Sequence, residues 1–215
     1  MNSELGNRNY GILVWNGATN TQIGGDDPLL GNIIDYTKIY DGVQIDHAGS
    51  GTKIQNNEIL INKNMGIYIA HTSGVEITDN YIVENQWDGV FITGNTANAN
   101  KVSENKIWNN GRKGIYLSNG ANQNIDAPSI SSASQFSASG TTCSGCTVEV
   151  YSDNAGQGQY YHGSVLAGAS GNWTYNGALK GPNITAINID VNGNTSEFSN
   201  PLTIDYFIFI PHIIR

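Results

Sequence analysis

Residues 64–85 read NMGIYIAHTSGVEITDNYIVEN, and a similar text returns at residues 88–110 as DGVFITGNTANANKVSENKIWNN. Each segment carries a glycine, then an apolar-x-apolar triplet, and later an asparagine and an isoleucine at matching positions. A period in the twenties is typical of stacked structural units, each of which buries its apolar side chains against its neighbours. The repeat therefore decides the fold of this part of the chain.

The pattern can be followed through five segments of the sequence. Their leading glycines are 31, 24, 23 and 25 residues apart, and they are Gly11, Gly42, Gly66, Gly89 and Gly114. Leucine-rich repeats share this period, but the leucine-dense consensus that they need is absent. Because the apolar residues alternate over two or three positions and then turn, they predict short parallel strands about 4.8 Å apart. The leading glycine is expected to permit a turn conformation.

A second pattern, apolar-x-x-Asn-x-Ile, runs between the glycines, and another asparagine follows its last isoleucine. Side-chain amides that recur in this way are expected to bond to one another along the stack. The predicted ladder residues are Asn57, Asn80 and Asn105, and then Asn62, Asn85 and Asn110. Lys53, Glu76 and Lys101 fall in one column of alternating charge, which independently favours this alignment of the coils.

Two longer stretches carry a family resemblance. TQIGGDDPLLGNIID (21–35) and GVQIDHAGSGTKIQNNEI (42–59) resemble the coils of right-handed parallel β-helix repeat proteins of the NosD and sugar-hydrolase types. The resemblance covers roughly residues 10–120 and implies a right-handed parallel β-helix of about five coils. It implies no particular activity, because this fold hosts many activities as well as none.

The period breaks at Pro128, and alternating segments with Gly/Asn turns follow from Thr147 onward. Such segments predict a small β-sandwich, and Asn192-Gly193 is a hairpin signal. The run that ends in DVNGNTSEFS (190–199) resembles the immunoglobulin-like module appended to many bacterial surface β-helix proteins. That resemblance implies a spacer or an adhesive unit.

We therefore expect an all-β chain of three parts. Residues 1–127 hold the β-helix repeats, residues 128–205 the immunoglobulin-like sandwich, and residues 206–215 an apolar tail. The tail is too short to span a bilayer. It resembles the tails of some exported bacterial β-helix proteins, which implies a sorting or anchoring tag, and a last edge strand is the alternative.

Charge and the N-terminus bear on partners and location. The net charge of −8 argues against nucleic acid as a partner, because no basic stripe is present to neutralise phosphates. The N-terminal residues lack the features of a signal peptide, yet the repeat is already running at Gly11 with no capping element before it. We expect a piece of a longer, exported protein, extracellular or at the cell surface.

Cys143 and Cys146 form a C-x-x-C pair with two interpretations. Redox chemistry would need a helix N-terminus, which an all-β context does not supply. In an exported protein the pair would staple the turn that enters a strand, and we expect this structural disulfide.

Three aromatic residues are the first candidates for ligand binding. Tyr68, Phe91 and Tyr116 are the middle residues of consecutive triplets, so they are expected to point outward in one column. Such a column would suit the rings of a polysaccharide or a cell-surface glycan. The alternative is that the rings only stabilise the sheet as cross-strand pairs, or lie beneath a loop or the C-terminal domain.

Two histidines are expected to lie side by side in consecutive coils. His47 and His71 follow equivalent strands, with Asp46 close by, and together could bind a transition metal or act as a base in a lyase. The next coil offers Gly94 instead of a third ligand. Solvated turn histidines are therefore the interpretation that we favour.

Four carboxylates are further candidates for catalysis or metal binding. Asp79 and Glu104 occupy one turn position in successive coils and could form a glycosidase pair or hold Ca²⁺. Asp153 and Asp190 lie in sequences that faintly resemble Ca²⁺ loops but lack the full spacing. Turn roles are simpler, so we expect no cofactor, with Ca²⁺ as the alternative.

These features together predict a structural or adhesive module that binds polysaccharide and carries no chemistry of its own. The first alternative is a polysaccharide lyase, glycoside hydrolase or epimerase that uses the outer face of the β-helix. The second is a scaffold that self-associates by stacking coils end to end into a fibre.

Overall fold

The computed structural model describes residues 6–204, where the chain is all-β apart from two short 3-10 helices, η2 (Pro28–Leu30) and η3 (Ala121–Asn124). The predicted tail at residues 206–215 lies outside this range. Within residues 6–204, no helix has the length and apolar character needed to cross a membrane.

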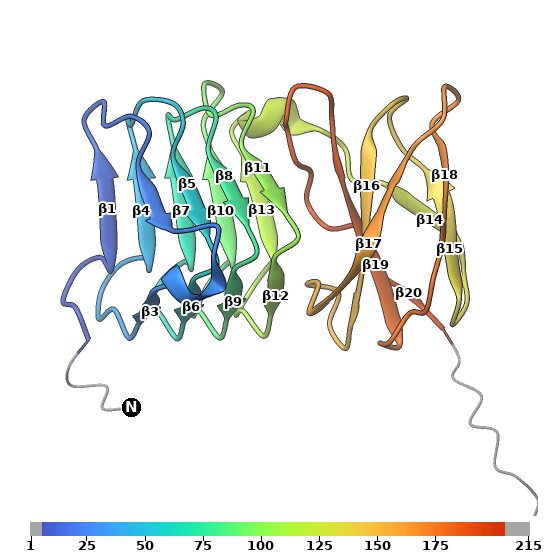
Figure 1. Cartoon of the computed structure of the whole chain (residues 1–215), viewed down its shortest axis with the longest axis horizontal. Helices are drawn as coiled ribbons and strands as arrows, with labels where there is room; N and C mark the ends of the chain where they lie inside the picture. Colours follow the sequence, from blue (N-terminus) through green and yellow to red (C-terminus); the bar gives the residue numbers. More distant parts are fainter. Residues whose placement is uncertain (1–5, 205–215) are drawn as a thin grey trace, which may run out of the picture.

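The repeats form three parallel sheets that run along one axis (Figure 1). The first sheet contains β1 (Ile12–Trp15), β4 (Val43–Asp46), β7 (Ile67–Ala70), β10 (Val90–Thr93) and β13 (Ile115–Ser118). The second contains β2 (Gln22–Gly24), β5 (Lys53–Gln55), β8 (Glu76–Thr78) and β11 (Lys101–Ser103). The third contains β3 (Ile33–Asp35), β6 (Glu58–Leu60), β9 (Tyr81–Val83) and β12 (Lys106–Trp108).

The spacing of the repeat sets the strand register. Ile67 of β7 pairs with Val43 of β4 and with Val90 of β10, so each apolar triplet lies against the preceding one. The first and third residues of a triplet point into the core and are fully buried in β4, β7 and β10, as Ile69 is, while the middle residue points outward. Columns of branched aliphatic side chains therefore fill the inside of the coils.

Three coils have a regular length, namely β4–β6, β7–β9 and β10–β12. A longer first coil, β1–β3, contains η2, and β13 follows the last regular coil. The expectation of about five coils is not met in the described residues, because the second and third sheets hold four strands each. After Ser118 the chain enters η3 instead of adding another strand to the second sheet.

The repeated glycines allow neighbouring coils to approach closely, which corrects the predicted turn role. A Cβ on Gly66 would lie 2.7 Å from the carbonyl oxygen of Gly89, and one on Gly89 would lie 2.7 Å from that of Gly114. Left-handed backbone falls instead on later residues of the coil, such as His47 and Asp79, with φ of 47° and 59°. A side chain at these glycines would push the backbones apart.

Two ladders of buried asparagines run along the stack at the positions that the sequence pattern marks. Asn57 Nδ2 donates to Asn80 Oδ1 at 3.0 Å, and Asn80 Nδ2 donates to Asn105 Oδ1 at 2.9 Å. Each Oδ1 also accepts a backbone N–H from the preceding coil, as Asn80 Oδ1 does from Asn57 at 2.9 Å. The second ladder repeats these contacts through Asn62, Asn85 and Asn110. The ladders satisfy the buried backbone of the turns.

Residues 129–203 form two antiparallel sheets. One contains β14 (Ser129–Ala133), β15 (Ser137–Thr141) and β18 (Asn172–Asn176), and the other contains β17 (Tyr160–Leu166), β16 (Thr147–Asp153), β19 (Asn183–Ile189) and β20 (Leu202–Thr203). Ala138 and Trp173 from the first pack in one buried core with Val148 and Ile184 from the second. The two sheets therefore pack against each other.

The antiparallel sheets lie at the β13 end of the stack and close it (Figure 1). Gln157 Oε1 accepts the Asn110 N–H at 2.9 Å, and its Nε2 donates to the Asn110 carbonyl oxygen at 2.9 Å. Gln157 thus takes the place of the next ladder asparagine. Thr195 Oγ1 accepts the Val102 N–H at 2.9 Å, and Tyr151 is buried against the apolar core of the coils. These contacts satisfy backbone groups that a further coil would otherwise pair.

Candidate functional site

The candidate site is the outer face of the first sheet, where the middle residues of the triplets form a row. Strand register places Leu13, Gln44, Tyr68, Phe91 and Tyr116 beside one another across β1, β4, β7, β10 and β13. The three aromatic residues of the row, which the sequence singles out, are half-buried. The regular parallel pairing therefore holds three rings and one amide side by side on an open face.

The rings of this row pack against one another. The centroids of Phe91 and Tyr116 are 5.1 Å apart with 18° between the ring planes, and those of Tyr68 and Phe91 are 5.5 Å apart at 61°. Lys113 Nζ lies 4.6 Å from the centroid of Tyr116. The ring faces of Phe91 and Tyr116 are therefore largely in contact with each other and with Lys113. Tyr68 is the last aromatic residue of the row and lies next to Gln44.

The hydroxyl of Tyr68 is protonated at neutral pH, as that of an ordinary tyrosine is, and its surroundings disfavour the phenolate further. Burial raises the pKa of Tyr68, and the charges of Asp46 and Asp41 raise it further. A protonated phenol can both donate and accept a hydrogen bond. Tyr68 therefore presents an apolar ring and a neutral polar tip, the combination that suits a polyhydroxylated ligand.

A third aromatic contact and a buried carboxylate lie near Tyr68, and sequence analysis missed both. Tyr10 stacks on Tyr40 with centroids 4.9 Å apart, and Asp41 Oδ1 accepts the Met65 N–H at 3.1 Å. Burial raises the pKa of Asp41 to about 6, and its hydrogen bonds oppose this shift only in part. The sequence marks Asp41 only by its position, because it directly precedes a repeat glycine.

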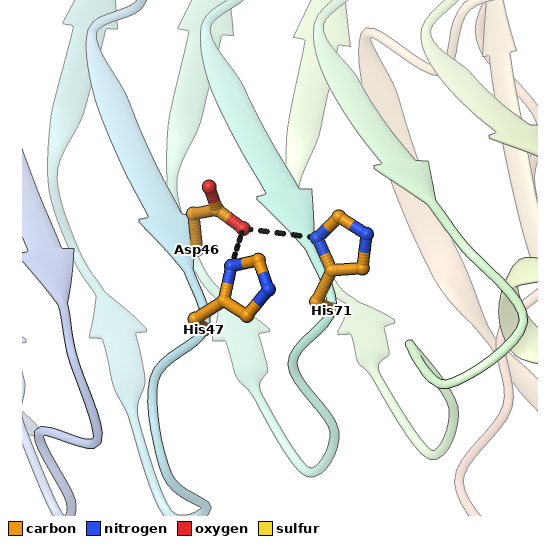
Figure 2. Close-up of side chains that lie close together, drawn as sticks. All are labelled: Asp46, His47 and His71. Carbon is orange, nitrogen blue, oxygen red and sulfur yellow. Dashed lines mark hydrogen bonds and ion pairs between the residues drawn. The ribbon is translucent and has the colours of Figure 1, made fainter.

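Asp46, His47 and His71 form a cluster at the end of the same face (Figure 2). His47 Nδ1 lies 2.8 Å and His71 Nδ1 lies 3.1 Å from the same carboxylate oxygen, Asp46 Oδ1. The imidazole rings stack with centroids 4.3 Å apart and 25° between their planes. Figure 2 shows the two ring nitrogens pointing toward this shared oxygen.

The histidine pair follows from the register of the turns after β4 and β7. Asp46 pairs with Ala70, so the residues that follow them, His47 and His71, take equivalent positions in successive coils. Both have left-handed backbone, with φ of 47° and 48°. Gly94, the next residue in this column, also has positive φ and carries no ligand atom.

Asp79 and Glu104 lie at a different corner of the β-helix. They follow β8 and β11, with φ of 59° and 60°, between the second and third sheets. The histidines instead lie between the first and second sheets. Glu104 is in contact with the antiparallel part, where Tyr161 donates to its Oε1 at 3.4 Å. The four weak catalytic candidates are therefore not brought into one site.

The two Ca²⁺ candidates are bonded to N–H groups of their own loops. Asp153 Oδ1 accepts the Ala155 N–H at 2.7 Å, and its Oδ2 accepts the Gly158 N–H at 2.7 Å. Asp190 Oδ1 accepts the Asn194 N–H at 2.9 Å. Although burial acts to raise the pKa of Asp190, hydrogen bonds from the surrounding asparagines lower it overall. Ca²⁺ needs six to eight oxygen ligands, so this geometry favours a turn role.

Cys143 and Cys146 form a disulfide with 5.4 Å between their Cα atoms. The Cys146 N–H also donates to the Cys143 carbonyl oxygen at 3.2 Å, immediately before β16. The bridge lies in a strand-entry turn, where an oxidised pair has a structural role and no helix N-terminus activates either sulfur.

An open hollow lies where the chain passes from the last coil to the antiparallel sheets, lined by Leu117, residues 124–130 and residues 197–202. Its Glu197 is already engaged, since Lys113 Nζ and the Leu117 N–H both donate to that carboxylate. This carboxylate therefore links the antiparallel part to the last coil.

Comparison with known proteins bears on the fold. Residues 29–127 match the family model described as the right-handed β-helix region. That range covers the regular coils and the three aromatic residues of the row, and it agrees with the right-handed parallel β-helix seen in the structure. A search of curated proteins finds no match.

Proposed function

We propose that this chain is a structural or adhesive module of an exported cell-surface protein, and that it binds polysaccharide through the outer face of its first sheet. The proposal includes no chemistry of its own for the module. The observation that carries it is the half-buried row of Tyr68, Phe91 and Tyr116 on a regular parallel sheet. The β-helix fold, which also hosts carbohydrate-related proteins, is consistent with this role.

The face has the dimensions and chemistry that an extended glycan requires. Four inter-strand steps span about 19 Å along the stack, enough for several sugar rings. A second outward row lies beside the aromatic one and supplies hydrogen-bonding groups from Thr93 and Ser118. Sugars combine apolar ring faces with hydroxyl rims, so alternating aromatic and polar rows are complementary to them.

The ring geometry gives the three aromatic residues different roles in the proposed binding of sugar. Because Phe91 and Tyr116 stack on each other, we propose that they act mainly as a rigid apolar support. Tyr68 has a neighbouring amide at Gln44 on one side, so its ring and hydroxyl are the proposed contact with sugar. Preorganised rings of this kind lose little conformational entropy on binding.

We further propose that the antiparallel part, residues 128–205, is an immunoglobulin-like module, and that residues 1–127 are the β-helix part. The strand orders β14-β15-β18 and β17-β16-β19-β20 agree with the A-B-E and C′-C-F-G sheets of such sandwiches. In this proposal the module is a spacer that also closes the end of the coils. A NosD-type, bacterial origin is part of the same proposal.

A glycan array, followed by assays for reducing ends and unsaturated products on every bound polysaccharide, tests the function. We expect binding without turnover, and binding that weakens in Tyr68→Ala. Tyr81→Ala is the matched control, because Tyr81 is an outward tyrosine of the third sheet. Its ring contacts that of Trp108, with 6.0 Å between the centroids. Turnover would favour the enzyme alternative. If the chain shows no binding and no turnover, the proposal is refuted and the scaffold alternative remains. Sedimentation velocity would then test that alternative.

A further inference from the structure

We propose that Asp46, His47 and His71 form a binding site for a borderline divalent transition-metal ion, with Zn²⁺ and Cu²⁺ as the ions that the ligand set fits. The inference rests on the geometry of these three side chains and is independent of polysaccharide binding. It adds a metal site to a face otherwise described by its aromatic row.

The ligand atoms already converge. His47 Nδ1 and His71 Nδ1 lie 2.8 Å and 3.1 Å from Asp46 Oδ1, and the three ligand atoms lie within 4.8 Å of one another. A tetrahedral ion with bonds of about 2.0–2.2 Å holds neighbouring ligand atoms about 3.3 Å apart. Small side-chain rotations would therefore admit the ion.

The backbone holds the two histidines in place before any ion binds. The His47 N–H donates to the Ala70 carbonyl oxygen at 3.3 Å, and strand pairing fixes the spacing of the two coils. Asp46 is the last residue of β4, and the two histidines directly follow β4 and β7, so the site lies at the ends of paired parallel strands. Sites built on such elements keep their ligands near the bound geometry at little entropic cost.

The choice of residue at this turn is also informative. The equivalent left-handed positions of the other coils hold Asn16, Gly94 and Asn119. Glycine, asparagine and histidine all adopt this backbone more readily than most residues, so the turn admits histidine without requiring it. In two consecutive coils of the described stack this position is histidine, beside Asp46. Both imidazoles are exposed, with 61% of the side-chain surface accessible in His47 and 51% in His71. Rings that stay this exposed bury little apolar surface, so packing gives them little stabilisation.

The ligand types decide the class of ion. Two imidazoles with one carboxylate suit borderline metals, whereas Ca²⁺ and Mg²⁺ prefer sets made of oxygen alone. For one set of ligands Cu²⁺ binds more tightly than Zn²⁺. Three protein ligands leave at least one position for water or for an incoming ligand, because the site is open to solvent.

Isothermal titration of the full chain with Zn²⁺, and separately with Cu²⁺, tests the proposal. The measurements use a His212→Ala background, so that a histidine outside the described residues does not contribute. We expect one ion per chain, and affinity at least tenfold lower in His71→Asn and in Asp46→Asn. Asparagine is suitable at residue 71 because other coils carry it at this turn. Millimolar Ca²⁺ should not compete.

Asp79→Asn is the matched control, since it removes one exposed carboxylate from another turn of the same β-helix. Its affinity for both ions should equal that of the parent. A second readout uses Trp15, which pairs with Asp46 across β1 and β4 and is 60% exposed. Cu²⁺ should quench its fluorescence, and Trp15→Phe should remove that quenching without changing the affinity.

Three results would overturn the proposal. These are no binding of either ion, binding that survives His71→Asn and Asp46→Asn unchanged, or an equal loss in Asp79→Asn. The last result would assign the binding to the general negative charge of the chain. Circular dichroism of each variant, matching that of the parent, shows that a lost site is not lost folding.

Discussion

Replacing Asn80 by alanine should destabilise the β-helix by several kcal/mol, because its fully buried amide connects three coils. Its Oδ1 accepts two hydrogen bonds from Asn57, from the backbone N–H at 2.9 Å and from Nδ2 at 3.0 Å. Its Nδ2 donates to the Ile54 carbonyl oxygen at 2.8 Å and to Asn105 Oδ1 at 2.9 Å. The alanine variant loses all of these partners at once.

The magnitude follows from the hydrogen bonds that the variant loses. The buried Asn57 N–H loses its acceptor and costs about 1–3 kcal/mol as an orphaned group. The two bonds that Asn80 Nδ2 donates, to the Ile54 carbonyl oxygen and to Asn105 Oδ1, contribute about 0.5–1.5 kcal/mol each, which gives about 2–6 kcal/mol in total. That is a large part of the stability of a typical domain, about 5–15 kcal/mol.

Urea denaturation followed by far-ultraviolet circular dichroism measures this loss. Asn98→Ala is the matched control, because Asn98 donates to the Asn95 carbonyl oxygen at 2.8 Å and accepts the Gln123 N–H at 2.9 Å on the exposed surface, where water can replace it. Its expected cost is about 1 kcal/mol or less. A loss of less than 1 kcal/mol in Asn80→Ala would refute the argument that the ladder satisfies otherwise unpaired backbone.

Two further outcomes follow from buried polar groups. Burial raises the pKa of Asp41 from 3.8 to about 6, so its contribution to stability is fully present below pH about 4 and is lost as the pH rises through 6. The free energy of unfolding of Asp41→Asn at pH 7 should therefore exceed that of the unmodified protein by up to about 3 kcal/mol, and it should vary less between pH 4 and 7. Urea denaturation of both proteins across this pH range measures the difference. Identical pH profiles would contradict the destabilisation by a buried Asp41 carboxylate. Gln157→Ala should cost about 1–3 kcal/mol, because the buried Asn110 N–H loses its acceptor. An unchanged urea midpoint for this variant would show that Gln157 does not cap the ladder.

Much of the β-helix could be predicted from the sequence, because one local pattern specifies the register of its coils. Repeats 23–25 residues apart place Ile67, Val43 and Val90 in one column, and the structure pairs them in that way. The same logic places His47 beside His71. The physical reason is that parallel stacking turns a sequence period directly into spatial neighbours.

The rest could not be predicted because it depends on contacts without a period. Gln157 meets Asn110 across 47 residues, and nothing in either local sequence marks that pairing. The glycine pattern was visible, but the close approach at Gly66 depends on the distance between coils, which sequence does not give. Likewise, alternation indicates that Phe91 points outward and does not fix the tilt of its ring against Tyr116.

The most direct measurement of the proposed function is the affinity of the intact chain for the polysaccharide found on the array. Titration calorimetry would compare the unmodified protein with Tyr68→Ala and Tyr81→Ala. Loss of one aromatic contact is worth about 1.4 kcal/mol, so Tyr68→Ala should bind about tenfold more weakly, while Tyr81→Ala should bind normally. Equal affinities for all three proteins would contradict binding through the outer face of the first sheet.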